Sequence, residues 1–292
     1  LKDEGTAVYL IAGSHDYSVS GKTFLDVLEK AGFCKICKFV ENDQEVILLP
    51  LKHEDVYIYG YPGKKAGLEI QSLRKLKIKE PYEKKFRILM LHTTISEVVS
   101  ENLPIESISI TKLPKADYYA LGHIHIDFEL DNNGKPVVYG GPTFPNNFKE
   151  LQELGKGCYY IVSLNGYTKI EKRIVLTKKP VFIDIYITNG LDGTKQIINA
   201  INQFEIHDSI VLLRVHGILE NGKVSDLDFK FIGDFIMKKK AYSWLKNTSK
   251  LEIKKQELEI SIDLKDVDTI EKVLIDKYEL DNPSEFNKKI FP

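Results

Sequence analysis

Three short apolar runs, each ending at a histidine-bearing cluster, constrain the fold of this chain more than any other feature. The runs are residues 7–11, 88–91 and 118–121, and the clusters after them are 13–16 (GSHD), 92–94 (HTT) and 122–125 (GHIH). Buried strands that finish on polar residues bring side chains from distant segments to one edge of a sheet in α/β proteins. Four of the seven histidines lie in these clusters, so the sequence predicts an α/β fold with a histidine-rich site.

A first folded unit is expected between residue 6 and about residue 163, where short strands alternate with short helices. The expected strands are 7–12, 36–40, 45–49, 55–59, 87–91, 117–121, 136–139 and 158–164. The expected helices are 21–31, 66–75 and 95–102. The turn signal DNNG at 131–134 joins two strands. This pattern indicates a layered α/β domain, with either one mixed sheet or two packed sheets.

A second, smaller unit is expected to begin near residues 177–180. Residues 181–187 alternate like a strand, and 192–204 carry an apolar stripe at helical spacing. A buried strand at 210–215 completes a β-α-β unit. A further helix and strand are expected within residues 229–245.

The tail from residue 266 is expected to form two short helices, capped by Asp266 or Asp268 and by Asn282. Their apolar faces, a candidate partner-binding surface, include Val267, Ile270, Leu274, Phe286 and Ile290. The polar stretch 246–265 before them is typical of a linker, and an exposed apolar helix face usually marks a partner site. Packing back onto the second unit is the alternative.

Charge and composition exclude several classes of protein. The net charge is −1, so no overall field attracts the chain to nucleic acid or membranes. The run Lys238, Lys239 and Lys240 is a candidate DNA contact or, alternatively, a solvated face. Three cysteines indicate a reducing compartment, and no apolar run approaches the roughly 20 residues that span a bilayer. A cytoplasmic protein is expected. Because the chain opens on Leu1 and runs almost at once into a strand, a piece of a longer protein is expected too.

The spacing of the histidines suits metal binding. His123 and His125 are separated by one residue, so at a strand end they point to the same side, about 6–7 Å apart along the chain. That arrangement suits two metal ions better than one, and His92 can share an ion with one of the pair. Asp16 follows His15 directly, and a carboxylate beside an imidazole fixes its tautomer and raises its basicity. A general acid or a transition-state stabiliser needs such a partner.

Each motif alone has a simpler explanation. An H-x-H pair on a strand is more often a surface or core feature than a pair of ligands. The GSHD cluster is also compatible with a helix start at which Asp16 is the cap. In this order and each at a strand end, the three motifs favour a two-metal site for in-line attack on a phosphoester.

Together the motifs resemble those of the calcineurin-like metallophosphoesterases. The finer match is to the SbcD-type DNA double-strand-break repair nucleases, particularly the archaeal ones, which work with a coiled-coil ABC-type ATPase. Further matching residues are 139–142 (YGGP), Asn147, Phe148, Glu150 and 155–157 (GKG). The resemblance covers nearly the whole chain, and its specific motifs lie in the first half.

The resemblance implies a layered α/β/β/α fold and three parts. These are an N-terminally truncated metallophosphoesterase domain at 1–176, a small α/β DNA-capping domain at 177–260 and a C-terminal helical ATPase-binding segment at 261–292. In the family's pattern, His92 and His123 bind one metal ion and His125 binds the other, with two manganese ions in the complete site. His15 is then the catalytic imidazole, oriented by Asp16.

Two departures from the family's pattern affect the first half of the site. Ser14 stands where the family usually has an asparagine whose carbonyl binds a metal, and a hydroxyl is a shorter and weaker ligand. The upstream D-x-H and G-D-x-x-D motifs, which supply the bridging carboxylate and most ligands of the first metal, are absent. Asp3 is the only Asp or His before Thr6, so the sequence is expected to begin inside the phosphoesterase domain.

The leading hypothesis is a metal-dependent DNA nuclease with endonuclease and 3′-to-5′ exonuclease activity in double-strand-break repair. The resemblance also implies a homodimer, paired through helices 21–31 and 66–76, and a cytoplasmic, nucleoid-associated protein. A second hypothesis is a calcineurin-like phosphatase or phosphodiesterase for a small substrate, which would not need the unit at 181–260 or the tail helices. A third is a non-catalytic scaffold that acts through DNA and ATPase contacts alone.

Overall fold

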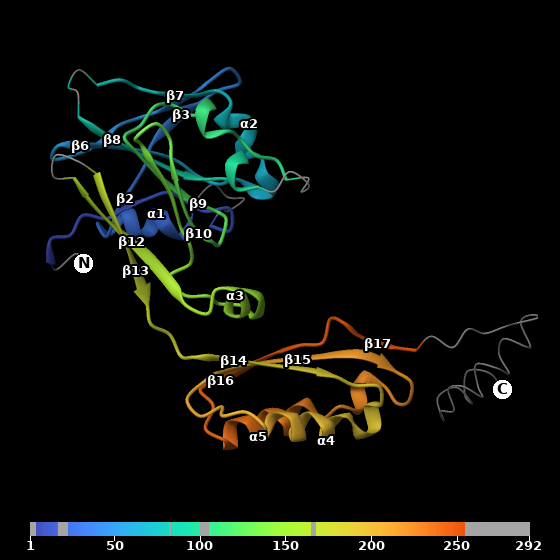
Figure 1. Ribbon diagram of the computed structural model, residues 1–292. Helices are drawn as coiled ribbons and strands as arrows, with labels where there is room; N and C mark the ends of the chain where they lie inside the picture. The colour runs from blue at the N-terminus through green and yellow to red at the C-terminus, as the bar shows by residue number, and fades with distance from the viewer. Residues whose placement is uncertain are drawn as a thin grey trace, which may run out of the picture.

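The computed structural model describes residues 4–16, 23–81, 83, 85–99, 105–164 and 168–254. Within these ranges the chain forms two bodies, each with its own apolar core (Figure 1). The predicted tail helices, with Val267, Ile270, Leu274, Phe286 and Ile290, lie outside the described residues. No helix in the described part of the chain is long and apolar enough to cross a membrane.

A six-stranded mixed sheet forms the centre of the first body. In spatial order its strands are β10 (Asp127–Asp131), β11 (Pro136–Gly140), β9 (Tyr118–Gly122), β8 (Phe86–His92), β6 (Val56–Tyr61) and β5 (Leu51–His53). The four inner strands run parallel, and the two outer strands pair antiparallel to their neighbours. The carboxyl ends of β6, β8, β9 and β11 therefore meet at one edge, where α/β proteins place their sites.

Smaller sheets and short helices surround this sheet. The sheets are β1 (Tyr9–Leu10) with β2 (Lys35–Ile36), β3 (Phe39–Glu41) with β4 (Val46–Leu48) and β7 (Leu76–Ile78), and β12 (Gly157–Leu164) with β13 (Thr168–Val175). The helices are α1 (Phe24–Lys30), α2 (Glu69–Leu73) and α3 (Phe148–Glu153), and the 3-10 turns are η2 (Lys65–Gly67), η3 (Ser96–Val98) and η4 (Ile110–Lys112). Buried side chains of the sheets and of α2, Leu48, Leu73 and Leu89 among them, form the core.

The segment after β1 packs closely on β6, because β6 carries a glycine there. A Cβ atom on Gly60 would lie 2.5 Å from Cγ2 of Ile11 and 2.8 Å from Cβ of Cys37. Cys37 is buried, and burial raises the pKa of its thiol to about 12, so it acts as a small apolar side chain. This close approach places residues 11–16 beside the carboxyl edge of the central sheet.

The second body is a parallel sheet with two helices on one face (Figure 1). Its strands are β14 (Pro180–Tyr186), β15 (Ile210–Leu219), β16 (Ser243–Asn247) and β17 (Leu251–Ile253), and each of the others pairs parallel with β15. Its helices are α4 (Gly190–Ile201) and α5 (Phe229–Lys238), with the 3-10 turn η5 (Val224–Asp226) between β15 and α5. Apolar residues of α4, α5 and one face of the sheet fill the core.

The predicted α/β character and most predicted elements are confirmed, and three details differ. The helix expected at 95–102 is, in its described part, only the turn at Ser96–Val98, because Ile95 forms a bridge with Ile108. The strand expected at 36–40 is two strands, β2 and β3. The stretch 246–265, expected to be a linker, contains β17, whose Leu251 is buried in the second core.

Candidate metal centre

His92 and His123 meet at the carboxyl edge of the central sheet. His92 is the last residue of β8 and pairs in register with Gly122, the last residue of β9. His123 therefore emerges directly beside His92. The Nδ1 atom of His123 lies 3.2 Å from the Nε2 atom of His92, and the two rings meet edge to face.

The backbone at His123 leaves the sheet instead of continuing the strand. Its φ is +97°, in the left-handed region that favours glycine. The expectation that the two imidazoles point to the same side assumed the alternation of a strand end, and the backbone at His123 does not follow that alternation. Because β9 ends at Gly122, the side chains of His123 and His125 follow the loop geometry. They contact different partners.

The 13–16 turn brings a third segment to the same place. The Oγ atom of Ser14 lies 3.4 Å from Nε2 of His92. The turn is closed twice: the N–H of Asp16 donates to the carbonyl of Gly13 at 3.2 Å, and the Asp16 carboxylate accepts from the N–H of Gly13 at 2.8 Å. His15 lies exposed within the turn. The role of Asp16 in orienting His15 stays a prediction.

The ring of His92 is packed among glycines. A Cβ atom built on any of them would lie within 3.3 Å of a ring atom, and they are Gly13, Gly63 and Gly122. Gly63 follows β6, and its N–H donates to the carbonyl of Ala12 at 3.0 Å. A Cβ on Gly63 would overlap both Cδ2 of His92 and the backbone nitrogen of Ser14. The Gly63 backbone is thus the surface on which the ring and the 13–16 turn rest.

A polar network holds the residue after Gly63. The ammonium group of Lys64 donates to Oε1 of Glu41 and to Oγ of Ser72, both at 2.9 Å. Glu41 also accepts from Tyr61 at 2.9 Å and from Ser72 at 2.6 Å. The backbone N–H of Lys64 donates to Glu69, a buried carboxylate on α2, at 3.1 Å. The segment behind the site is therefore fixed by donors and acceptors from β3, β6 and α2.

Burial and the neighbouring imidazole of His123 lower the pKa of His92 to about 4, against the opposing effect of the Asp16 carboxylate. At neutral pH the ring of His92 is uncharged, which is the state in which imidazole binds a cation.

His125 has a different partner, Glu150 on α3. Its Nδ1 atom lies 2.7 Å from Oε1 of Glu150. Burial raises the pKa of Glu150, but hydrogen bonds from His125, Asn146 and Asn147 lower it more, so the carboxyl is ionised at neutral pH. A carboxylate only accepts, so Nδ1 of His125 carries a proton, and in the neutral imidazole the lone pair for a ligand is on Nε2.

Two further residues join this site beyond the predicted set. The sequence matched Glu150 to the family pattern but did not give it a role; its position three residues after Asn147 is the pattern of a capped helix start, which the structure shows at α3. The buried Tyr139 donates to the carbonyl of Thr93 at 2.9 Å and accepts from the N–H of Ile95 at 3.0 Å. It thereby fixes the segment that follows His92. Only contacts across the sheet reveal this.

The donors fit a divalent cation only in part. A 3.2 Å separation of two imidazole nitrogens is compatible with both binding one ion at bond lengths of about 2.1 Å. Across the described ranges, no group of three or more His, Cys, Asp and Glu side chains is gathered around one point. An ion held by His92 and His123 would need further ligands, for which the Ser14 hydroxyl and water are chemically suitable.

The structure does not bring the lysine run to this site. Lys238 is the last residue of α5, on the helical layer of the second body (Figure 1). The ammonium group of Lys239 lies 5.6 Å from the ring centre of Phe235, and the carbonyl of Lys240 accepts from the N–H of Asp208. Helix α3 and the first body lie on the opposite face of the second body's sheet (Figure 1).

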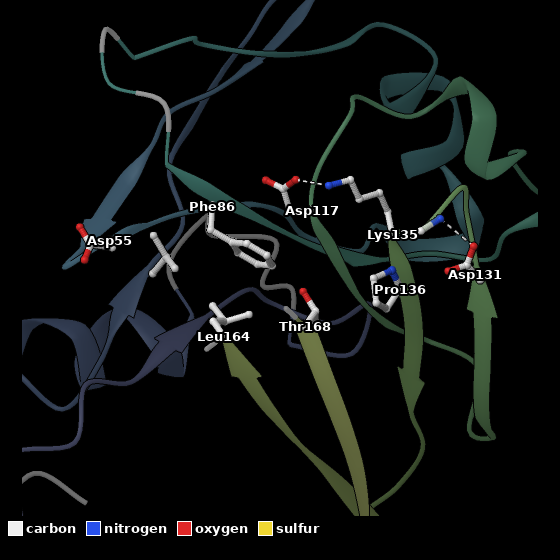
Figure 2. A pocket seen from close by; sticks show the side chains of 10 residues that line it. Asp55, Phe86, Asp117, Asp131, Lys135, Pro136, Leu164 and Thr168 are labelled. Atoms are coloured by element: carbon white, nitrogen blue, oxygen red, sulfur yellow. Dashed lines mark hydrogen bonds and ion pairs between the residues drawn. The ribbon is translucent and has the colours of Figure 1, made fainter. Parts of the chain in front are cut away.

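A cavity of about 630 Å³ lies at the opposite, amino-terminal edge of the central sheet (Figure 2). Its lining includes Phe86 at the start of β8 and Pro136 at the start of β11. Figure 2 shows Lys135 reaching Asp117, with Nζ 2.6 Å from Oδ1. Because the parallel strands run away from this edge, the cavity is separate from the histidine site.

Comparison with known proteins identifies relatives, although no protein-family model matches the chain. The chain is similar to the DNA double-strand break repair protein Mre11 of Archaeoglobus fulgidus, with 26% identity over 63% of this chain and 43% of the relative. The Mre11 protein of Methanocaldococcus jannaschii is 27% identical over 70% of this chain and 54% of the relative. The uncharacterized metallophosphoesterase YhaO of Bacillus subtilis is 28% identical over 57% and 39%, respectively.

The chain thus spans about half the length of the Mre11 relatives it matches. These similarities confirm the resemblance to the SbcD-type nucleases of the calcineurin-like metallophosphoesterase superfamily. The mixed α/β architecture with several sheets agrees with a metallophosphoesterase fold.

Proposed function

We propose that this chain is part of a metal-dependent nuclease that hydrolyses DNA phosphodiester bonds in double-strand-break repair. The observation that carries the proposal is the convergence of Ser14, His92 and His123 from three distant segments at one sheet edge. Two similar proteins are named as double-strand break repair proteins and a third as a metallophosphoesterase. A phosphoester is therefore the bond class that this edge is proposed to cleave.

His92 and His123 are proposed to hold one divalent cation and His125 a second, with manganese as the metal. Two bound cations supply Lewis-acid activation of water and of the phosphoryl group. The chain's own contribution is preparation of the ligands. His92 is kept neutral by burial, and the Glu150 carboxylate keeps the Nε2 lone pair of His125 free.

His15 is proposed as the general acid or transition-state stabiliser. It lies exposed in the turn whose Ser14 faces His92. The Asp16 carboxylate closes that turn on the Gly13 N–H, which fixes the backbone that carries the His15 imidazole. A positioned imidazole of this kind moves a proton to or from the reacting phosphoester oxygen.

The finer assignments form part of the same proposal. They are exonuclease and endonuclease activity, the domain boundaries at 1–176, 177–260 and 261–292, DNA contacts at Lys238, Lys239 and Lys240, a homodimer, and an ATPase partner for the tail. Removal of residues 266–292 should abolish association with a coiled-coil ABC-type ATPase and leave DNA cleavage largely intact. Association that survives the removal contradicts the assignment of the tail.

Manganese-dependent cleavage of linear DNA by the full-length protein tests the catalytic proposal. His15→Asn and His123→Ala should abolish cleavage, whereas His207→Ala, an exposed histidine of the second body, should not. Cleavage that survives both site substitutions contradicts the proposal.

Two further measurements separate the alternatives. Hydrolysis of an aryl phosphodiester without DNA cleavage would favour a small-substrate phosphodiesterase. Calorimetric titration that detects no manganese binding, together with salt-sensitive DNA binding, would favour the scaffold.

A further inference from the structure

Helix α3 lies between the two bodies (Figure 1) and contacts β14 and β16 of the second. On the side of the first body, Glu150 accepts a hydrogen bond from His125. The carboxylate is held in turn by the N–H of Asn146 at 3.2 Å and by the side-chain amide of Asn147 at 2.5 Å. The position of α3 therefore decides where the partner of the His125 imidazole lies.

The apolar side of α3 is buried on the sheet of the second body. Leu151, only 3% exposed, packs against Ile210 and Leu212 of β15 in a small core of its own. The ring of Phe148 meets that of Phe182 on β14 edge to face, with centres 6.1 Å apart. A helix of six residues has little stability by itself, so this apolar contact is the main support of α3.

Arg214 of β15 extends over the same contact. Its guanidinium lies 4.9 Å from the ring centre of Phe182 and 5.6 Å from that of Phe148. One of its nitrogens donates to Oε1 of Gln152 on α3 at 2.5 Å. A guanidinium that stacks on aromatic rings while it donates a directed hydrogen bond fixes orientation as well as position.

We propose that the second body positions His125: β14 and β15 hold α3 through Leu151 and Arg214, and α3 then presents Glu150 to the imidazole. The second body thus contributes to the site without supplying a ligand. If the sheet of the second body were displaced, Glu150 would move away from His125. The Nδ1–H tautomer of His125 would then lose the hydrogen bond that favours it. The proposal rests on the proposed function only where it treats His125 as a metal ligand.

The first test is nuclear magnetic resonance of the imidazole nitrogens of the metal-free, full-length protein. Arg214→Met keeps an unbranched side chain about as long as the aliphatic stem of arginine and removes the guanidinium with its hydrogen bond and charge. Leu151→Ala removes the apolar contact. Both substitutions should decrease the Nδ1–H population of His125 and leave the signals of His92 unchanged.

Matched controls separate positioning from general destabilisation. Lys246→Met removes another cation–aromatic pair of the second body, in which Nζ lies 4.2 Å from the ring centre of Phe229. Ile197→Ala weakens the second core at a fully buried residue outside the small core that Leu151 shares with β15. Neither control should change the His125 tautomer. If the Leu151→Ala protein does not fold, the tautomer measurement on Arg214→Met tests the proposal by itself.

Manganese titration provides the second readout. Mutation of a ligand's outer-shell partner typically costs about 10–100-fold in metal affinity. Arg214→Met only displaces that partner, so it should weaken one binding event by up to about tenfold. Unchanged His125 signals in folded Arg214→Met protein overturn the proposal. If the parent protein binds no metal and cuts no DNA, the proposed function fails, yet the tautomer measurement still decides whether the second body positions His125.

Discussion

The Nε2 atom of His92 and the Nδ1 atom of His123 lie 3.2 Å apart, although the two residues are 31 positions apart in the sequence. The parallel register of β8 and β9 creates this approach, because it places Gly122 directly beside His92. Two ring nitrogens at this distance are close enough to bind the same cation. The relationship makes the two imidazoles a unit rather than two independent ligands.

Replacement of either member of this unit should remove most of the binding of one ion. Mutation of an outer-shell residue typically weakens metal binding about 10–100-fold. His92→Ala and His123→Ala should each weaken manganese binding by more than this, because each removes a ligand. The double variant should bind little more weakly than either single variant, because the same ion is lost each time. Isothermal titration calorimetry measures this, with His207→Ala as the control. Additive losses would show that the two imidazoles bind separate ions.

Gly63→Ala should damage both the fold and the site. The new methyl group would overlap the ring of His92 and the backbone of Ser14, and overpacking of this kind costs about 1–3 kcal/mol in free energy of unfolding. Manganese binding should weaken as well, because the ring must move. Urea unfolding and metal titration measure the two effects. Gly140→Ala is the matched control, since a Cβ there meets no atom within 4 Å. Equal behaviour of the two variants would contradict the packing argument.

Glu150→Gln should weaken the second metal site selectively. An amide can replace the acceptor but not the charge, so it stabilises the Nδ1–H tautomer of His125 less well. We expect about 10–100-fold weaker binding of one manganese ion and unchanged binding of the other. Glu153→Gln, on the same helix and exposed, should leave both events unchanged. A uniform loss at both sites would indicate that Glu150 acts on the fold rather than on His125.

The Glu41 network should make stability depend on pH. Burial raises the pKa of Glu41, but hydrogen bonds from Ser72, Lys64 and Tyr61 lower it more, leaving it below the ordinary value of 4.5. A carboxyl with a lowered pKa in the folded state stabilises the fold above its unfolded-state pKa, and this stabilisation is lost as the pH falls through the folded-state value.

Urea unfolding between pH 7 and about pH 3 measures this loss. Glu41→Gln should lose less stability below about pH 4.5 than the parent protein does, whereas Glu153→Gln should follow the parent. Identical pH profiles for Glu41→Gln and the parent would exclude the network as the source.

Neutralisation of the lysine run should change the salt dependence of DNA binding. Each phosphate contact contributes about 0.9 to the slope of log affinity against log salt concentration. The triple substitution of Lys238, Lys239 and Lys240 by Gln should therefore reduce the slope by up to about 3. Lys195→Gln, exposed on α4, is the control. An unchanged slope would show that the run is a solvated face.

The central part of the site was predictable because its signals are local. β8 and β9 contain the apolar runs 88–91 and 118–121, and a histidine at or directly after the end of each strand lies at the carboxyl edge of a parallel sheet. The approach of His92 to His123 follows once these strands are neighbours. The second unit was also predictable, because α4 carries apolar residues at helical spacing and β15 begins as a continuous apolar run.

The rest of the site depends on contacts between segments that sequence spacing does not encode. Nothing local places Glu150 next to His125, because α3 is positioned by the second body. The backbone leaves the strand at His123, so the side-chain alternation of a strand does not predict how His123 and His125 are oriented. Short strands such as β17 and β7 are too brief to show a period. The closeness of Gly63 to His92 emerges only when β6 pairs with β8.

The left-handed backbone at His123 places function and stability in opposition at one residue. A non-glycine residue held in such a region costs on the order of 1–3 kcal/mol, which is a sizeable share of the net stability of a typical domain. Glycine at position 123 would relieve this backbone strain and so raise the free energy of unfolding, but it would also remove the imidazole nitrogen that faces His92. The histidine at position 123 therefore lowers the stability of the fold and supplies the ring nitrogen that faces His92.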